Sequence, residues 1–181
     1  MGVLDHPLII AFDRHIDALV ERRRGNRLVD RAFYAASEAA NHSMVWHALA
    51  WAPVLGDRAR WRRAVVVSTI LGIESGLVNG PVKMLFRRER PEHVDARPHR
   101  LRTPRTSSFP SGHATSAMCA AILLSDGRKR RWGIFALAGA VASSRVYVRI
   151  HHASDVIGGL VFGTGFGLLA RRALRRCCTS R

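Results

Sequence analysis

The sequence predicts an all-α, membrane-embedded protein: a bundle of six helices, of which five span the bilayer and one, at the N-terminus, lies in its interface. Two features of the 181-residue chain support this fold class. Clusters of arginine alternate with uncharged apolar stretches, as in proteins that cross a membrane several times. The last three apolar stretches are rich in glycine and alanine, and small residues let helices approach closely within a bilayer.

The domain organisation follows from the length of the chain and from the periodicity of its first residues. The chain is long enough for one domain and too short for two of ordinary size. In residues 1–30, Leu8, Phe12 and Ile16 recur at helical spacing between charged side chains, which predicts an amphipathic helix in the membrane interface. Residues 31–176 are predicted to form the helical domain that carries the chemistry, and residues 177–181 a short basic tail.

Five spanning helices are expected in the central domain, over residues 32–56, 64–86, 111–125, 132–149 and 154–172. Gly80-Pro81 is expected to kink the second of them. A basic loop punctuated by prolines, residues 87–109, joins this second helix to the third. Loops of this length in compact domains tend to be functional.

A soluble helical bundle is the competing interpretation. No stretch reaches the twenty clean apolar residues of an obvious span, and the mean hydropathy of -0.01 is low for an integral membrane protein. The apolar stretches are short largely because Glu74, Lys83 and Arg145 interrupt them. Ionisable residues within spans usually face a functional cavity, so these interruptions also agree with a membrane bundle.

The charge of the chain is strongly positive, with 29 lysines and arginines against 13 acidic residues and a net charge of +16. In a soluble protein such a balance would first indicate nucleic acid. Here the arginines are separated by apolar stretches rather than gathered on one continuous face, which argues against a nucleic-acid binder. Their placement predicts contact with anionic membrane lipids.

The first of three chemical motifs is Lys83, followed seven residues later by Arg90 and Pro91. Two cations there can clamp phosphate oxygens, arginine with its planar fork and lysine as a point charge. A basic helix end at the level of the lipid headgroups has the same appearance. The first motif alone therefore does not define a site.

The second motif is Pro110-Ser111-Gly112-His113, directly before an apolar helical stretch. At a helix N-terminus unpaired amides and the helix dipole favour an anion, and Gly112 lets the backbone come close to it. His113 can then act as a general acid on a leaving-group oxygen. The alternative is a structural one, in which Ser111 caps the helix and His113 is incidental.

The third motif is Ser144-Arg145, followed by His151 and, four residues later, Asp155. This spacing lets the carboxylate accept a hydrogen bond from Nδ1 of His151, which leaves Nε2 unprotonated and able to attack phosphorus. Arg145 supplies a third cation. His152 lacks the four-residue relation to a carboxylate, so His151 is the predicted nucleophile.

Taken in order, the three motifs resemble the type 2 phosphatidic acid phosphatase (PAP2) superfamily. Every defining position of its pattern, KxxxxxxRP, PSGH and SRxxxxxHxxxD, is matched in this sequence. The resemblance implies that His151 forms a phosphohistidine, that Asp155 orients it, and that His113 protonates the leaving group and later activates water. It also implies that no metal or other cofactor is needed and that the phosphate is bound by Lys83, Arg90, Ser111, Gly112 and Arg145.

The expected substrate is a phosphate or diphosphate on a lipid or polyprenol, because the site would lie near the lipid headgroups. The compact chain resembles small bacterial members of the superfamily, including decaprenylphosphoryl-phosphoribose phosphatases of cell-wall synthesis. The expected partners are membrane lipids, and the expected location is the bacterial cell membrane. Basic segments at residues 58–63 and 128–131 slightly favour an extracytoplasmic site, since they would lie at the opposite, cytoplasmic end.

Two other functions remain open. An inactive lipid-binding or scaffold protein could retain the fold, although the complete set of His113, His151 and Asp155 argues against it. A vanadate-dependent haloperoxidase holds vanadate with the same motif residues, because vanadate mimics the phosphoryl transition state. Those enzymes are large and soluble, unlike this short apolar chain. The sequence indicates no particular oligomeric state.

Overall fold

The structure is a computed structural model that describes residues 3–91, 106–125 and 128–179, so most of the predicted loop over residues 87–109 lies outside the described residues. The described part is all-α, as the sequence predicts, and contains seven α-helices rather than six. They are α1 (Pro7–Glu21), α2 (Arg27–Ala39), α3 (Met44–Gly56), α4 (Trp61–Leu77), α5 (Gly112–Leu124), α6 (Arg128–Tyr147) and α7 (Ala153–Thr179).

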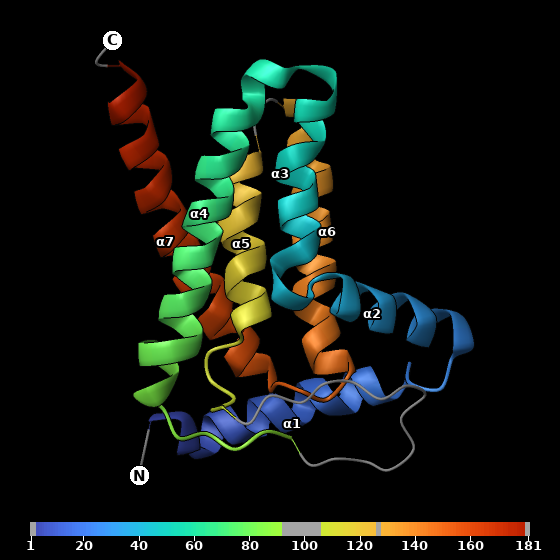
Figure 1. The fold of residues 1–181 in the computed structure, drawn as a ribbon. Coiled ribbons are helices and arrows are strands. Elements are labelled where there is room, and N and C mark those ends of the chain that lie inside the picture. The colour runs from blue at the N-terminus through green and yellow to red at the C-terminus, as the bar shows by residue number, and fades with distance from the viewer. Residues whose placement is uncertain (1–2, 92–105, 126–127, 180–181) are drawn as a thin grey trace.

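The helices form an upright bundle with two helices laid across one end. In Figure 1, α3, α4, α5, α6 and α7 stand upright, while α1 and α2 lie across the end at which α7 begins. Helix α5 is the centre of the bundle, because it packs against α3, α4, α6 and α7. Helix α1 contacts α6 and α7, and α2 contacts α6. The crossing helices therefore cover the end of the bundle where the second and third motifs lie.

The packing of α5 on α7 depends on glycine, as the composition predicts. A Cβ atom added at Gly163 of α7 would lie 2.3 Å from the backbone oxygen of Thr115 on α5, and one at Gly159 would lie 2.5 Å from the backbone oxygen of Ser111. Such distances leave no room for a side chain. The two backbones approach closely because these positions carry none.

The prediction of one helix over residues 32–56 was wrong. Helix α2 ends at Ala39, a 3-10 turn occupies Asn41–Ser43, and α3 begins at Met44. Two consecutive residues in this turn have positive φ angles, 51° at His42 and 60° at Ser43. The chain changes direction there, so that α2 lies across the bundle and α3 stands within it (Figure 1).

The reason for the break lies in the amphipathic character of α2. This helix buries Tyr34 and Ser37 and exposes the charged residues Arg31 and Glu38. A helix with a charged face is suited to the end of the bundle rather than to its middle. The boundary predicted at residue 30 falls within α2, since α1 ends at Glu21 and α2 starts at Arg27.

The kink predicted at Gly80-Pro81 is confirmed. Helix α4 gives way to a π-helical turn, Val78–Val82, in which Gly80 adopts non-helical angles (φ -98°, ψ -107°). Proline cannot donate a backbone hydrogen bond, and its ring disturbs the preceding turn. The distortion comes immediately before Lys83, whose side chain is buried.

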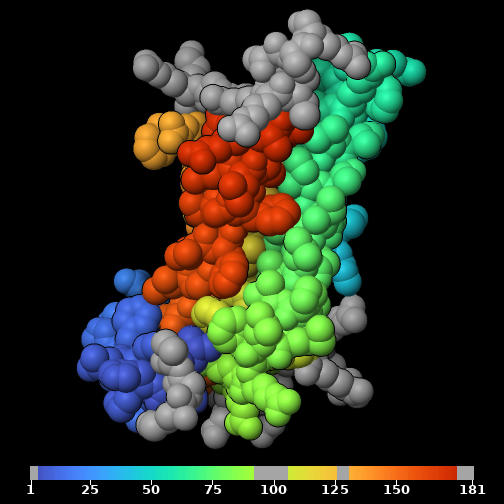
Figure 2. All heavy atoms as spheres, turned by 90° about the vertical axis from the view of Figure 1, so that its left-hand side faces the viewer, coloured from blue at the N-terminus to red at the C-terminus, as the bar shows by residue number. Residues whose placement is uncertain are grey.

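Within the part of the chain that the structure describes, two segments, Arg58–Val82 and Ala153–Leu174, are long and apolar enough to cross a membrane. Only 22% and 33% of their most apolar windows are buried within the protein, so most of this apolar surface faces outward. Figure 2 shows α7 and α4 running along one face of the molecule. Ile73 of α4 and Val161 of α7 are 52% and 67% exposed. The core helix of a soluble bundle would bury such residues, and this exposure favours a lipid environment.

Candidate active site

The three motifs meet at the end of the bundle that α1 and α2 cover. A cavity of about 410 Å³ is lined there by residues of all three motifs: Lys83, Gly112, His113, Arg145 and His151. Arg90 lies beside it, with Nη1 3.4 Å from Nε2 of His151. Ser111 and Asp155 are buried behind the lining, where the backbone N–H of Ser111 donates to the Asp155 carbonyl at 3.0 Å.

The cavity has the chemical character of an anion site. Lys83 and Arg145 are both buried in its wall, and none of its described lining residues is acidic. Three buried donor groups of the motifs, Arg90 Nε, Ser111 Oγ and Arg145 Nε, find no hydrogen-bond partner within the described part of the chain. Buried polar atoms are normally paired, and the oxygens of a bound phosphate would pair these.

The unpaired hydroxyl of Ser111 argues against the capping interpretation of the second motif. Ser111 precedes the first residue of α5 but makes no side-chain capping bond to that helix. A serine that served only as an N-cap would hydrogen-bond to the first-turn amides. The structure therefore shows no capping role for the Ser111 side chain.

Close packing accounts for Gly112 at the start of α5. A Cβ atom there would lie 2.8 Å from Oδ1 of Asn79, another residue that lines the cavity. His113 follows, and its Nε2 lies 3.2 Å from Oδ1 of Asn41 in the turn between α2 and α3. The break that the sequence did not predict thus supplies a partner for His113.

His151 lies in the link between α6 and α7, and the backbone of Arg145 fixes its place. The Arg145 carbonyl accepts hydrogen bonds from the amides of both Ile150 and His151, each at 3.1 Å. In the turn between Arg145 and Ile150, Arg149 adopts a positive φ of 53°. This backbone conformation turns the chain back toward the cavity. This local turn explains why the third motif requires a fixed spacing between its arginine and its histidine.

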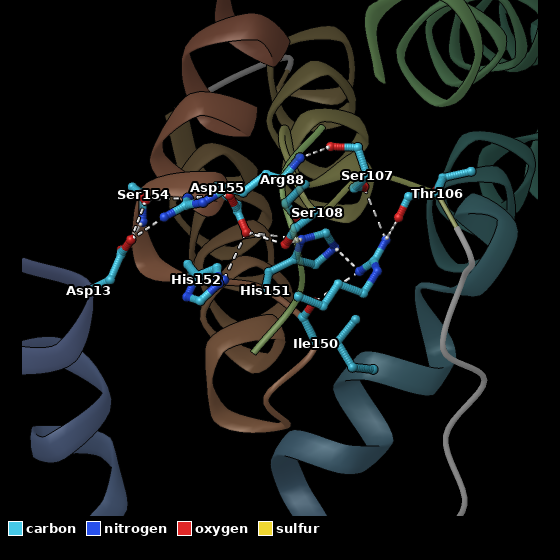
Figure 3. Close-up of polar contacts among 12 residues, drawn as sticks. Asp13, Arg88, Thr106, Ser107, Ser108, Ile150, His151, His152, Ser154 and Asp155 are labelled. Carbon is cyan, nitrogen blue, oxygen red and sulfur yellow. Dashed lines mark hydrogen bonds and ion pairs between the residues drawn. The ribbon is translucent and has the colours of Figure 1, made fainter. Parts of the chain in front are cut away.

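The contacts of His151 define its tautomer (Figure 3). The Arg90 guanidinium, which can only donate, lies 3.4 Å from Nε2, so Nε2 acts as an acceptor and the ring proton sits on Nδ1. Nδ1 lies 3.6 Å from Oδ2 of Asp155. This arrangement leaves the Nε2 lone pair directed toward the cationic side of the site.

Burial also controls the charge of the site residues that lie outside the spans. It lowers the pKa of His151 to about 3, with Arg90 and Arg145 acting in the same direction and Asp155 opposing them. His151 is therefore neutral at physiological pH, as a nucleophile must be. Burial, followed by the nearby charge of Arg90, lowers the pKa of Lys83 to about 8, so Lys83 keeps its charge at neutral pH.

Two partners of Asp155 were missed by the sequence analysis. Ser108 Oγ donates to Oδ2 at 2.5 Å, and Arg88 Nη1 donates to Oδ1 at 2.5 Å. The backbone N–H of His152 also donates to Oδ2, at 2.9 Å. Arg88 is one of three arginines between Lys83 and Pro91, and nothing in their spacing distinguishes the one that turns toward Asp155.

No three histidine, cysteine, aspartate or glutamate side chains are grouped closely enough to hold a metal ion in the ranges that the structure describes. The candidate ligands for a phosphate are instead cations, amides and a hydroxyl. A helical bundle with lipid-facing spans and a buried cationic cavity beside a neutral histidine is the form expected of a membrane phosphatase.

Comparison with known proteins agrees with the resemblance of the motifs. The model of the PAP2 superfamily matches residues 61–177, and the chain belongs to this superfamily. It is 37% identical over 130 residues to a decaprenylphosphoryl-5-phosphoribose phosphatase of Mycolicibacterium smegmatis, covering 69% of this chain and 68% of that one. A lipid A 1-phosphatase of Rhizobium etli is 36% identical over 124 residues, which cover 65% of this chain and 52% of the relative.

The fold is also that of a solved PAP2 structure. A transmembrane PAP2-type phosphatidylglycerolphosphate phosphatase from Bacillus subtilis superimposes with a TM-score of 0.77. The match covers 96% of this chain and 89% of that one, at 21% sequence identity. At this level of identity the likeness concerns the fold alone.

Proposed function

We propose that the chain is a metal-independent phosphatase that acts on a phosphate or diphosphate carried by a membrane lipid or polyprenol, through a phosphohistidine at Nε2 of His151. The observation that carries the proposal is the cationic cavity beside the unprotonated Nε2 atom. Its unpaired buried donors match the oxygens of a phosphoryl group, and its neutral histidine matches the requirement for a nucleophile.

In the first step of the proposed reaction, Nε2 of His151 attacks phosphorus, and the bond from phosphorus to the lipid oxygen breaks. The leaving oxygen takes a proton from His113. Lys83, Arg90 and Arg145, together with the Ser111 and Gly112 turn, neutralise the charge of the phosphoryl oxygens in the transition state. Asp155 holds the Nδ1 proton of His151 and so keeps the ring in its reactive tautomer.

In the second step the phosphohistidine is hydrolysed. His113, now neutral, takes a proton from water, and the resulting hydroxide attacks phosphorus as the bond to Nε2 breaks. Inorganic phosphate leaves, and both histidines return to their starting states. The same residue serves as acid and then as base, as microscopic reversibility favours for a two-step displacement.

The membrane arrangement belongs to the same proposal. Helices α3 to α7 span the cell membrane, and α1, which exposes Leu8, Phe12 and Leu19, lies in the interface at the level of the site. A cavity at headgroup depth suits a lipid phosphate, and the named activities of the two relatives above support that class of substrate. Arginines near the N-terminal ends of α4 and α6, at the far end of the bundle (Figure 1), favour a cytoplasmic far end and an extracytoplasmic site.

The test measures phosphate release from a panel of lipid phosphates by protein purified in detergent, with EDTA present. We expect His151→Ala to abolish turnover and EDTA to leave it unchanged. His152→Ala is the matched control. Among the described residues, His152 bonds to Asp155 through its backbone N–H, and this group remains when the side chain is removed. Activity that survives in His151→Ala, or that is lost with EDTA, would contradict the mechanism. A wild-type protein that releases no phosphate from any substrate would instead support an inactive lipid-binding protein.

A further inference from the structure

Asp13 of the N-terminal helix α1 is buried next to the proposed active site, although none of the three motifs includes it. Its carboxylate is only 6% exposed, whereas Leu8 and Phe12 on the same helix are exposed. Oδ1 accepts from the backbone N–H of Ser154 at 2.8 Å, and Oδ2 accepts from the Ser154 hydroxyl at 2.7 Å. The carboxylate thus holds the first turn of α7, where the next residue is Asp155.

Asp13 also shares a cation with Asp155 (Figure 3). Arg88 donates from Nη2 to Asp13 Oδ2 at 2.6 Å and from Nη1 to Asp155 Oδ1 at 2.5 Å. All three side chains are at most 10% exposed. One guanidinium therefore bridges two carboxylates, and the group of three keeps one net negative charge.

The net charge of this group matters for His151. Nδ1 of His151 faces Asp155 Oδ2, and its ring becomes positive when Nε2 binds the phosphoryl group. A buried negative charge beside the ring stabilises that state. Without Asp13, the charge of Arg88 would balance that of Asp155, and the ring would face a neutral ion pair. Arg88 would also lose one of the contacts that hold it against Oδ1, while the Ser154 hydroxyl would still accept from its Nη1 at 2.7 Å.

We propose that Asp13 is a positioning residue for phosphoryl transfer, which acts through Arg88 and Ser154 to place Asp155 and keeps the group of Asp13, Arg88 and Asp155 net negative. The inference rests on the function proposed above. It makes α1 part of the catalytic apparatus, in addition to any role at the membrane interface. Asp13 does not line the cationic cavity of about 410 Å³; its bonds to Arg88 and Ser154 connect it to Asp155 and so to His151.

The test compares Asp13→Asn with the wild type in a steady-state assay of phosphate release. The amide keeps the shape of the side chain and an oxygen for the Ser154 N–H, but it removes the charge. We expect kcat to fall about tenfold, as for other groups that orient a catalytic residue through a hydrogen bond, and KM to stay within about twofold. Asp17→Asn is the matched control: Asp17 lies one turn further along α1 and pairs with Arg24 at 2.7 Å, away from Arg88.

Inhibition by orthovanadate provides a readout that a purely structural role would not change. Vanadate resembles the phosphoryl transition state, so its inhibition constant should weaken in parallel with kcat/KM in Asp13→Asn. The inhibition constant of inorganic phosphate, a ground-state ligand, should stay near that of the wild type. Equal weakening for both anions would indicate a damaged cavity and would overturn the proposal.

A double-mutant cycle with Asp155→Asn tests whether Asp13 influences phosphoryl transfer through Asp155 or by another route. If Asp13 acts through Asp155, adding Asp13→Asn to Asp155→Asn should change kcat by less than about twofold. A full tenfold loss in that background, or a wild-type kcat in Asp13→Asn alone, would overturn the proposal. If Asp13→Asn does not fold, Arg88→Lys replaces it in the same cycle, because lysine keeps the charge but cannot bridge both carboxylates in this geometry. Turnover that survives His151→Ala would refute the proposed function as a whole. The double-mutant cycle, by contrast, tests only the coupling of Asp13 to Asp155.

Discussion

Removal of the Ser108 hydroxyl tests the environment of Asp155 most directly. Ser108 is fully buried, and its Oγ donates to Asp155 Oδ2 at 2.5 Å. The same Oγ lies 3.5 Å from His151 Nδ1. Ser108→Ala therefore removes one donor from the carboxylate and leaves Arg88 and the His152 amide in place. The carboxylate is then held less firmly beside the ring of His151.

The size of the effect follows from the kind of bond that is lost. A hydrogen bond to a charged group contributes about 1.5–3 kcal/mol. Because two other donors still hold Asp155, we expect the lower end of that range, which corresponds to a fall in kcat of about tenfold. KM should change by less than about twofold, since Ser108 does not line the cavity that receives the phosphate.

The assay combines steady-state kinetics with trapping of the phosphorylated enzyme. Rapid quenching with a radiolabelled substrate should show slower formation of an acid-labile phosphohistidine in Ser108→Ala. Ser107→Ala is the matched control, because within the described residues its hydroxyl accepts the Arg88 backbone N–H, at 3.2 Å, and makes no bond to Asp155. We expect its kcat to remain within about threefold of the wild type.

The reasoning would be refuted by a normal kcat in Ser108→Ala alongside an inactive Asp155→Ala. It would also be refuted if the loss appeared only in KM, because the hydroxyl would then act on substrate binding. A melting temperature measured in the same detergent separates either result from unfolding. Loss of activity without a fall in the folded fraction at the assay temperature is the expected outcome.

Two further predictions concern the charge of the site and the packing of the bundle. Lys83 is protonated below its pKa of about 8, so kcat/KM should fall as pH rises through that value, and Lys83→Arg should move the fall to higher pH because a guanidinium keeps its charge. A wild-type profile that stays flat to about pH 10 would exclude a charged Lys83 from substrate binding. Gly163→Ala should destabilise the protein by about 1–3 kcal/mol, because the new methyl group meets the α5 backbone. Gly165→Ala, where a Cβ has nothing within 4 Å, should leave the melting temperature unchanged or slightly raised, and equal effects of the two substitutions would contradict the packing argument.

Much of the fold could be predicted because local patterns report local structure. Both ends of α5 and the start of α7 lie within one residue of the predicted ones, although α7 continues to Thr179 instead of ending at residue 172. The kink at Gly80-Pro81 follows from the geometry of proline. The break between α2 and α3 could not be predicted with the same confidence, because His42 and Ser43 carry no strong turn signal. Its one visible sign was that charged residues end near Glu38, where the uncharged stretch begins.

The candidate site likewise combines residues that could be identified from the sequence with residues that could not. The cationic and nucleophilic groups could be identified from three motifs, since each motif lies at a helix end or in a short turn whose spacing is fixed by the local backbone. Ser108, Arg88 and Asp13 could not be identified, because serine, arginine and aspartate are common in such segments. Only their distances from Asp155 and from one another distinguish them from similar neighbours.

The sequence by itself determined which chemical groups this protein has and the short-range geometry among them, such as the i to i+4 relation of His151 to Asp155. The tertiary structure decided how those groups are held. Asp13 and Ser154 are 141 positions apart, and Arg88 and Asp155 are 67 apart. Contacts over such separations depend on how α1 and α7 pack against the bundle, and helical periodicity carries no information about that. The physical reason is that the spacing of a residue in the sequence determines which face of its own helix it occupies. Which residue of another helix contacts that face depends on the whole fold.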